Sequence, residues 1–248
     1  MLIINADDWG RSSTETDVIV KFFKDQRITS VSAMVYMDDS ERAARIAIDT
    51  QIDVGLHLNF SQPFALKSGN SRLYEYHERI INFLTKSKYA LIFYNSRLKK
   101  EFHYVYQAQF DEFVRLYGKL PSHINGHHHY HLCTNMLIDR IIPSKQKVRR
   151  SFSFWPGMQN LLKRGYRRLV DYWLTNYYIV TDYFIALPYF INFKNSINTP
   201  EISNGITIEL MTHPFHKMDY DYLMSKDYQH FISNIEKGTY SDLIPSKD

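Results

Sequence analysis

Histidines and paired carboxylates are the residues of this sequence best suited to chemistry. The stretch HINGHHHYHL, residues 123–132, holds five of the eleven histidines in the chain. If this stretch is extended, His127, His129 and His131 project from one face, because side chains alternate along a strand. A neutral imidazole needs both a donor and an acceptor, so several rings on one face indicate a metal ion or an acid between them. A histidine-rich surface loop remains the alternative.

Three further polar groups lie at or near the ends of predicted strands. They are the pair Asp7–Asp8 after an apolar run, His57 between the leucines of GLHLNF, and His213 in IELMTHP. Each has an ordinary structural explanation, namely a helix-capping turn, a hydrogen-bonded core histidine, and a histidine that merely ends a strand. Adjacent buried carboxylates, however, repel each other unless a cation or hydrogen bonds compensate them. We expect these groups to form one site if the fold brings the strand ends together.

The apolar pattern alternates strands with helices. Strands are expected at 2–5, 30–36, 53–60, 122–129, 147–154 and 205–214, and helices at 13–24, 40–48 and 97–117, with Ser40 and Gly118 as helix caps. Such alternation predicts an α/β fold, in which a parallel sheet or barrel is covered by helices and the chemistry gathers at the carboxyl ends of the strands. We expect one domain over residues 1–248, with 61–96 and 155–200 as insertions or lid segments.

Composition limits the class of protein. The chain has 248 residues, 44% of them hydrophobic, which is enough for a sizeable core, and its net charge of +4 is only mildly basic. We therefore expect no nucleic-acid partner. Basic clusters at 145–150 and 163–168 are expected on solvated helix faces, with an anionic or lipid-linked substrate near a membrane surface as the alternative. Aromatic residues at 172–193 could serve a homodimer interface.

The single cysteine and the apolar pattern bear on the compartment. Cys133 alone excludes an internal disulfide. The N-terminus shows no secretion signal, and the aromatic stretch 172–193 is interrupted by Asp182 and Pro188, so no apolar span of roughly 20 residues exists there. We expect a cytoplasmic protein.

The candidate residues favour hydrolytic metal chemistry. One carboxylate and two imidazoles, with positions left for water, suit Zn²⁺ or another divalent transition ion, and suit Mg²⁺ less well. Such an ion lowers the pKa of its water toward about 7 and polarises a carbonyl. The sequence contains no glycine-rich phosphate loop and no G-x-S-x-G motif. Glu209 shares a strand face with His213 and is expected one layer below it, as a supporting partner.

Four motifs in order, NADDWG, GLHLNF, SHINGHHHYHL and IELMTHP, resemble those of the YdjC-like carbohydrate deacetylases from end to end of the chain. The resemblance implies a distorted (β/α) barrel of the polysaccharide-deacetylase type and one divalent metal ion. It also implies that N-acetyl groups are removed from amino sugars in small glycans or glycolipids. By position, the implied metal ligands are Asp8, His57 and His127. The implied general base is Asp7, and the implied proton donor to the leaving amine is His213.

The resemblance also implies a substrate-binding group, consisting of Asn125, His129, His131 and Arg149. The chain departs from the family pattern at Asn125, where the family usually has Asp, and at Trp9, where it usually has Phe. An amide can hydrogen-bond a ring or a hydroxyl but supplies no negative charge, so the tuning of the site is expected to differ. Two other functions remain open: a metal-dependent phosphoesterase and a non-catalytic glycan-binding protein on the same fold.

Overall fold

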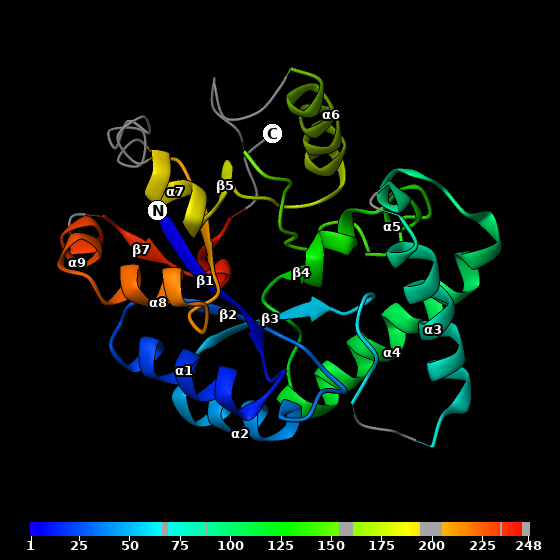
Figure 1. The fold of residues 1–248 in the computed structure, drawn as a ribbon, viewed down its shortest axis with the longest axis horizontal. Helices are drawn as coiled ribbons and strands as arrows, with labels where there is room; N and C mark the ends of the chain where they lie inside the picture. The colour runs from blue at the N-terminus through cyan, green and yellow to red at the C-terminus, as the bar shows by residue number, and fades with distance from the viewer. Residues whose placement is uncertain (66–68, 88, 154–160, 194–204, 234, 245–248) are drawn as a thin grey trace.

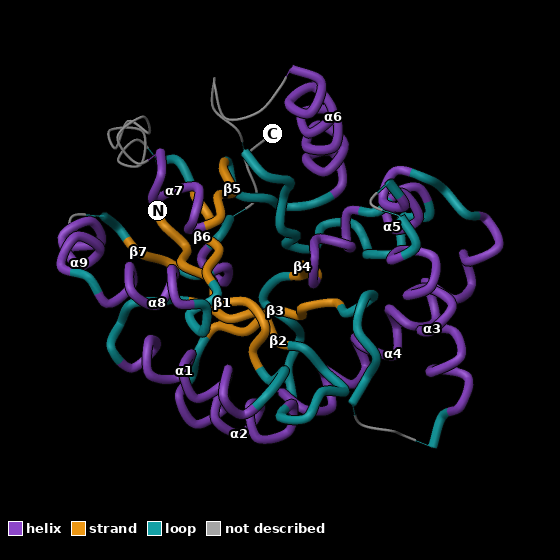
Figure 2. Tube along the Cα trace, viewed as in Figure 1, coloured by secondary structure: helices purple, strands orange, loops and turns teal. Residues whose placement is uncertain are grey.

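The fold is a parallel sheet covered by helices, seen in a computed structural model that describes residues 1–65, 69–87, 89–153, 161–193, 205–233 and 235–244 (Figure 1). The strands are β1 (Leu2–Trp9), β2 (Ser30–Ala33), β3 (Asp53–Leu58), β4 (Ile124–Gly126), β5 (Tyr183–Ala186), β6 (Ile208–Thr212) and β7 (Lys237–Gly238). The α-helices are α1 (Ser13–Lys24), α2 (Ser40–Thr50), α3 (Ser71–Thr85), α4 (Lys99–Tyr117), α5 (Thr134–Ile138), α6 (Leu161–Tyr177), α7 (Leu187–Phe193), α8 (Lys217–Met224) and α9 (Lys226–Ser233). Strands lie inside and helices outside, as Figure 2 shows.

All paired strands run parallel, in the order β4-β3-β2-β1-β6-β5. The central strand β1 is buried at every residue and has β6 along one edge. Its other edge is shared, because β7 pairs with Leu2 and Ile3 while β2 pairs from Asn5 onward. Parallel strands place their carboxyl ends at one edge of the sheet, so the residues that follow β1, β3, β4 and β6 come together there.

The sheet curls but does not close into a regular barrel, which confirms the expected distorted barrel. Between β4 and β5, a regular barrel would have a further strand. Here Val148 makes one isolated parallel bridge with Ile124, and Lys147 makes another with Ile179. The predicted strand at 147–154 is therefore wrong for its described part, residues 147–153. These bridges, with a hydrogen bond from Arg149 N to the Ile124 carbonyl oxygen at 3.0 Å, nevertheless hold Arg149 beside β4.

Several element boundaries differ from the sequence-based expectation. The predicted helix at 13–24 is confirmed, and Gly118 ends α4 in the left-handed conformation, as expected. Ser40 is the first residue of α2, whereas its N-cap is Asp39, because the Ser40 hydroxyl bonds Met37 N and Met34 O instead. The predicted strand 122–129 shrinks to three residues, and 30–36 and 53–60 end early. The segments left unassigned contain α3, α6, β5 and α7.

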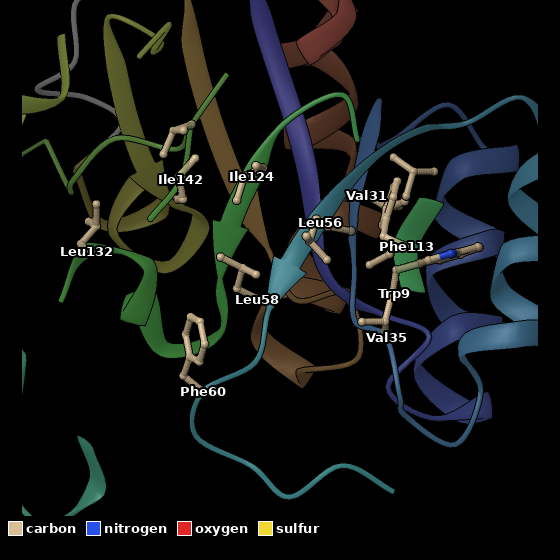
Figure 3. Close-up of a cluster of buried hydrophobic side chains, with 14 of the residues drawn as sticks. Trp9, Val31, Val35, Leu56, Leu58, Phe60, Phe113, Ile124, Leu132 and Ile142 are labelled. Atoms are coloured by element: carbon tan, nitrogen blue, oxygen red, sulfur yellow. The ribbon is translucent and has the colours of Figure 1, made fainter. Parts of the chain in front are cut away.

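Hydrophobic packing between the sheet and its helices holds the strand ends in place. Trp9 of β1, Val31 of β2 and Phe113 of α4 lie together in the hydrophobic core (Figure 3), and each is at most 1% exposed. Burial of such large side chains is worth about 1.5–3 kcal/mol each. Because Trp9 follows Asp8 directly, its packing anchors the end of β1. Among the described helices, none is both long and apolar enough to cross a membrane.

Candidate functional site

Three side chains, at or near the carboxyl ends of β1, β3 and β4, meet at one edge of the sheet. Asp8 is at the end of β1, His57 is in β3, and His127 follows β4 directly. Asp8 Oδ1 lies 3.3 Å from His57 Nε2 and 3.0 Å from His127 Nδ1. One ligand atom from each residue lies within 4.8 Å of the others, and all three residues are buried. This is the spacing of side chains that share one ion.

Unpartnered buried atoms show that these residues fit a divalent cation. Asp8 Oδ1 and His57 Nε2, which lie 3.3 Å apart, are buried and make no hydrogen bond within the described part of the chain. Buried polar atoms without partners are costly, and a metal ion is one of the few groups that would satisfy a carboxylate oxygen and imidazole nitrogens together. Burial would raise the pKa of Asp8, but contacts with His127 and His57 hold it well below its usual value. The carboxylate is therefore ionised, as a metal ligand must be.

The backbone at Asp8 is strained in a way that serves the site. Asp8 has a φ of 67°, in the left-handed region, and the pairing of β1 with β2 shifts register between Ala6 and Trp9. A non-glycine residue in this region costs on the order of 1–3 kcal/mol. A bulge redirects side chains that would otherwise point to opposite faces. As a result, Asp7 and Asp8 both exert their charge on His57.

Asp7 belongs to a buried ion-pair network. Arg149, which is fully buried, donates from Nη1 to Asp7 Oδ2 at 2.7 Å and from Nη2 to Asp7 Oδ1 at 2.7 Å. The same guanidinium donates to Glu209 Oε1 from Nε at 2.8 Å, and Tyr240 donates to the other Glu209 oxygen. Although burial opposes it, Arg149 with His57 holds the pKa of Asp7 well below its usual value. Glu209 supports the site one layer below, as expected.

Asn125 lies between a metal-ligand candidate and this ion-pair network. With its oxygen toward β3, Asn125 Oδ1 lies 2.7 Å from His57 Nδ1, and its nitrogen donates to Ser32 Oγ at 2.7 Å. With the amide turned over, the nitrogen donates to His57 Nδ1 at 2.7 Å. Its oxygen then accepts from Ser32 and from the two terminal nitrogens of Arg149, at 2.9 and 3.1 Å. The two orientations demand opposite tautomers of His57.

His213 faces the same edge from β6, with more access to solvent. It follows Thr212, the last residue of β6, and its backbone N–H donates to Asp219 Oδ2 at 2.7 Å. Burial lowers the pKa of the His213 imidazole, while the charges of Asp7 and Asp8 act to raise it. His213 is thus close enough to both carboxylates to sense their charge. Its ring is partly exposed and stacks on that of His216.

The expected face of three alternating histidines does not exist. Residues His127–Leu132 form a 3₁₀ segment, in which His128 and His129 have φ values of 52° and 59°. The chain turns back so closely that a side chain at Gly126 would lie 3.0 Å from the backbone nitrogen of His131. The prediction of an extended 123–131 was therefore wrong, because period-two alternation applies only to a strand. Among these three, only His127 joins the metal-ligand group.

The other two histidines of that run have different surroundings. His131 is 1% exposed, and its Nε2 bonds the Arg149 carbonyl oxygen at 3.1 Å. His129 is partly exposed, and its ring meets that of Phe152 edge-on, with centroids 4.5 Å apart. His129 therefore lies beside an aromatic surface, whereas His131 braces the backbone that carries Arg149.

Sequence reasoning missed several supporting residues. Asn5 donates from Nδ2 to Asp7 Oδ1 and to Ser32 Oγ, both at 2.8 Å. Arg11 Nη1 lies 2.9 Å from Asp8 Oδ2 and also pairs with Glu15. Asn5 and Arg11 bracket the Asp7–Asp8 pair in sequence, so their position was a usable signal. Nothing in the sequence near Ser32 or Tyr240 pointed to the site.

Comparison with known proteins places the chain in a family. A family model described as YdjC-like protein matches residues 1–234. The chain is similar to a chitooligosaccharide deacetylase from Citrobacter koseri, 28% identical over 135 residues, which cover 53% of this chain and 50% of that protein. It is also similar to a carbohydrate deacetylase from Clostridium beijerinckii, 30% identical over 131 residues, which cover 52% and 50%. The chain spans about half the length of these curated relatives in the matched regions.

A solved structure shares the fold. A crystal structure from Enterococcus faecalis, described as a proposed cellobiose-phosphate cleavage protein, matches with a TM-score of 0.65. It covers 98% of both chains at 20% identity. At this identity the likeness shows the architecture only. The family model, in contrast, covers nearly the whole sequence, including every motif that supplies the site, and the chain belongs to the YdjC-like protein family.

Proposed function

We propose that this chain is a metal-dependent hydrolase that removes the N-acetyl group from an amino sugar in a small glycan or glycolipid. The observation that carries this proposal is the buried trio Asp8, His57 and His127, whose ligand atoms lie within 4.8 Å of one another. Two of these atoms, Asp8 Oδ1 and His57 Nε2, have no hydrogen-bond partner among the described residues. The similar proteins named chitooligosaccharide deacetylase and carbohydrate deacetylase support the substrate class. A donor set of one carboxylate and two imidazoles favours Zn²⁺ or a similar transition ion over Mg²⁺.

The residues of the site divide the work of amide hydrolysis. An ion held by Asp8, His57 and His127 would supply Lewis acidity, acidifying water and polarising the acetyl carbonyl. Asp7 accepts the proton of the attacking water through Oδ2, which takes a single hydrogen bond, from Arg149. The low pKa of Asp7 keeps it ionised but makes it a weak base, so it needs a water that has been acidified. Arg149 holds Asp7 in this orientation.

His213 completes the proton transfers in this proposal. Because burial lowers its pKa, the imidazole is neutral in the resting protein. It takes up a proton from solvent and donates it to the leaving nitrogen, while the proton that Asp7 accepted returns to solvent. The nearby charges of Asp7 and Asp8 favour that uptake. The products are acetate and a free amine. Attack on the carbonyl and protonation of the amine are separate steps, so two groups with different pKa values are required.

Substrate contacts fall mainly to His129. This imidazole is partly exposed beside Phe152 and can meet a sugar ring or hydroxyl. His131, Asn125 and Arg149 are at most 1% exposed. We therefore assign these three to positioning, in which they act on substrate through His57, Asp7 and the backbone around them.

The test is acetate release from a panel of N-acetylated oligosaccharides and glycolipids. The protein is assayed as purified, after chelation, and after addition of Zn²⁺ or Mg²⁺, and its metal content is measured in parallel. Release that needs the ion, and that is lost in Asp8→Ala and His127→Ala, is the expected result. His103→Ala is the matched control, because His103 is an exposed histidine of α4. Full activity and metal content in His127→Ala would contradict the proposal.

Two other outcomes of this assay would favour a different function. Metal-dependent cleavage of a phosphodiester, without acetate release, would indicate a phosphoesterase. Binding of acetylated glycans by metal-loaded protein, without any product, would indicate a non-catalytic binding protein.

A further inference from the structure

A polar cavity lies where α6 approaches β5 (Figure 1), and none of the metal-ligand trio lines it. Its volume is about 180 Å³. Its polar walls carry four arginines and one carboxylate, namely Arg150, Arg164, Arg167, Arg168 and Asp171. Three of these arginines come from the basic cluster at 163–168, which nothing in the proposed hydrolysis uses.

The single carboxylate is already occupied. Asp171 Oδ2 accepts from Arg150 Nη2 at 2.8 Å. Asp171 Oδ1 accepts from the backbone nitrogen of Ser151 at 3.0 Å and from its hydroxyl at 2.7 Å. Asp171 therefore pairs directly with Arg150, and no described carboxylate forms an ion pair with the other three arginines.

The remaining guanidiniums have few partners within the described part of the chain. Arg164 Nε is buried and makes no hydrogen bond there. Arg150 leaves only its Nε unpartnered, because its Nη1 also donates to the carbonyl oxygens of Thr181 and Asp182. Arg167 stands over Phe152 at 6.0 Å, and burial lowers its pKa. Arg164, Arg167 and Arg168 form no ion pair with any described carboxylate, and residues 154–160, just before α6, include no Asp or Glu. Arg164 and Arg167 are partly buried and Arg168 is exposed, and partly desolvated cations without a paired carboxylate favour an anion between them.

We propose that this α6 cavity is a binding site for a phosphate-type anion. A guanidinium matches phosphate oxygens in a planar, two-pronged arrangement, and hydrogen bonds between two charged groups are the strong kind. The volume supports an anionic group in place of a whole ligand, because pockets for drug-sized molecules run to about 300–1,000 Å³. Several arginines on one helix and the adjoining segment give the site its selectivity for a doubly charged group.

Two kinds of ligand carry a phosphate group that fits this cavity. A phosphate carried by a saccharide could reach both sites, since Phe152 lies under Arg167 and also meets His129. A phospholipid headgroup presents the same oxygens from a membrane surface. The site does not depend on the proposed deacetylation, because none of its arginines contacts the metal-ligand trio.

The test uses chelated full-length protein, so that phosphate cannot bind through a metal ion. Calorimetric titrations would be made with inorganic phosphate and with an N-acetylated amino-sugar phosphate beside its unphosphorylated form. Co-sedimentation with phosphatidylglycerol vesicles, against neutral vesicles, covers the lipid source. The variant is Arg164→Gln with Arg167→Gln. Lys163→Gln is the matched control, an exposed cation of the same helix outside the cavity.

Saturable binding of at least one phosphate probe, weakened at least about tenfold by the double variant but not by Lys163→Gln, is expected for two lost charge-assisted hydrogen bonds. Preference for the sugar phosphate over inorganic phosphate assigns the saccharide source. Variant-sensitive binding to anionic vesicles, without that preference, assigns the lipid source. Failure of all probes to bind, or equal weakening by the control, would overturn the site. Acetate-release activity of the variants has no bearing on this result.

Discussion

Replacement of Asn125 by Asp is predicted to tighten metal binding. His57 can offer Nε2 to an ion only when its ring proton sits on Nδ1, and that N–H then needs an acceptor. The group beside Nδ1 is the Asn125 amide, 2.7 Å away. The same amide faces Arg149, which can only donate. One amide oxygen cannot accept from both sides, whereas the two oxygens of a carboxylate can.

The size of the effect follows from the hydrogen bond that is lost. When the Asn125 oxygen faces His57, its nitrogen faces the two terminal nitrogens of Arg149, at 2.9 and 3.1 Å, and no bond forms. A hydrogen bond to a charged group is worth about 1.5–3 kcal/mol. At about 1.4 kcal/mol per factor of ten, the present site gives up roughly 10- to 100-fold in metal affinity. The Asn125→Asp variant should lower the dissociation constant for Zn²⁺ by that factor.

The assay is calorimetric titration of chelator-treated protein with Zn²⁺ at a fixed pH. Asn135→Asp is the control, since Asn135 is an equally buried asparagine, in α5, bonded to the backbone of Asn95. It should lose stability without any change in metal affinity. Metal-free Asn125→Asp should also be less stable than the parent, because the new carboxylate lies near Asp7. An affinity equal to that of the parent would refute the assignment of His57 Nε2 as a ligand atom poised by this amide.

Three other outcomes follow from the contacts. Arg149→Met should lower the free energy of unfolding, measured by urea denaturation, by about 3–5 kcal/mol, because it leaves Asp7 and Glu209 buried without their partner. Replacement of an exposed arginine should change that free energy by no more than about 0.5 kcal/mol. Zn²⁺ at 100 times its dissociation constant should raise the free energy of unfolding by about 2.7 kcal/mol, and the same addition should do nothing in His127→Ala. Burial lowers the pKa of His77 from 6.5 to about 4, so the unfolded chain binds a proton over this range that the folded protein does not. Stability should therefore fall by about 3 kcal/mol from pH 7 to pH 4, and denaturation curves of His77→Gln should lack that part of the decrease.

The sequence predicted the fold class well because the signal was repeated along the chain. Apolar runs that end in Asp7–Asp8, His57 and His213 mark strands whose carboxyl ends meet in any parallel α/β sheet. That single rule brings together residues more than 200 positions apart, and it does not depend on where each strand ends. The motif resemblance then identified the same strand ends.

Local geometry was less predictable, because it depends on backbone conformations that the sequence pattern does not indicate. The left-handed conformations of Asp8, His128 and His129 are uncommon for non-glycine residues. Each is maintained by surrounding packing, such as the burial of Trp9 beside Asp8 and the contact of Gly126 with His131. At the histidine run an extended strand was the better local expectation, whereas at Asp8 the sequence favoured a turn after a strand at 2–5 and the strand instead continues to Trp9. The tertiary structure overrides the local expectation where the site is built.

The charges of the site give an independent reason to expect a divalent cation. Within the described residues, Asp7, Asp8, Glu15 and Glu209 pair with two guanidiniums, those of Arg11 and Arg149. With every carboxylate ionised, this leaves two negative charges in a buried cluster, and one divalent ion would neutralise them. Without an ion, part of this negative charge can be balanced by a proton on His57, because Asp7 and Asp8 raise the pKa of His57 although its burial lowers it. The histidine run is the conspicuous feature of the sequence, but the carboxylates set the charge that the site must balance.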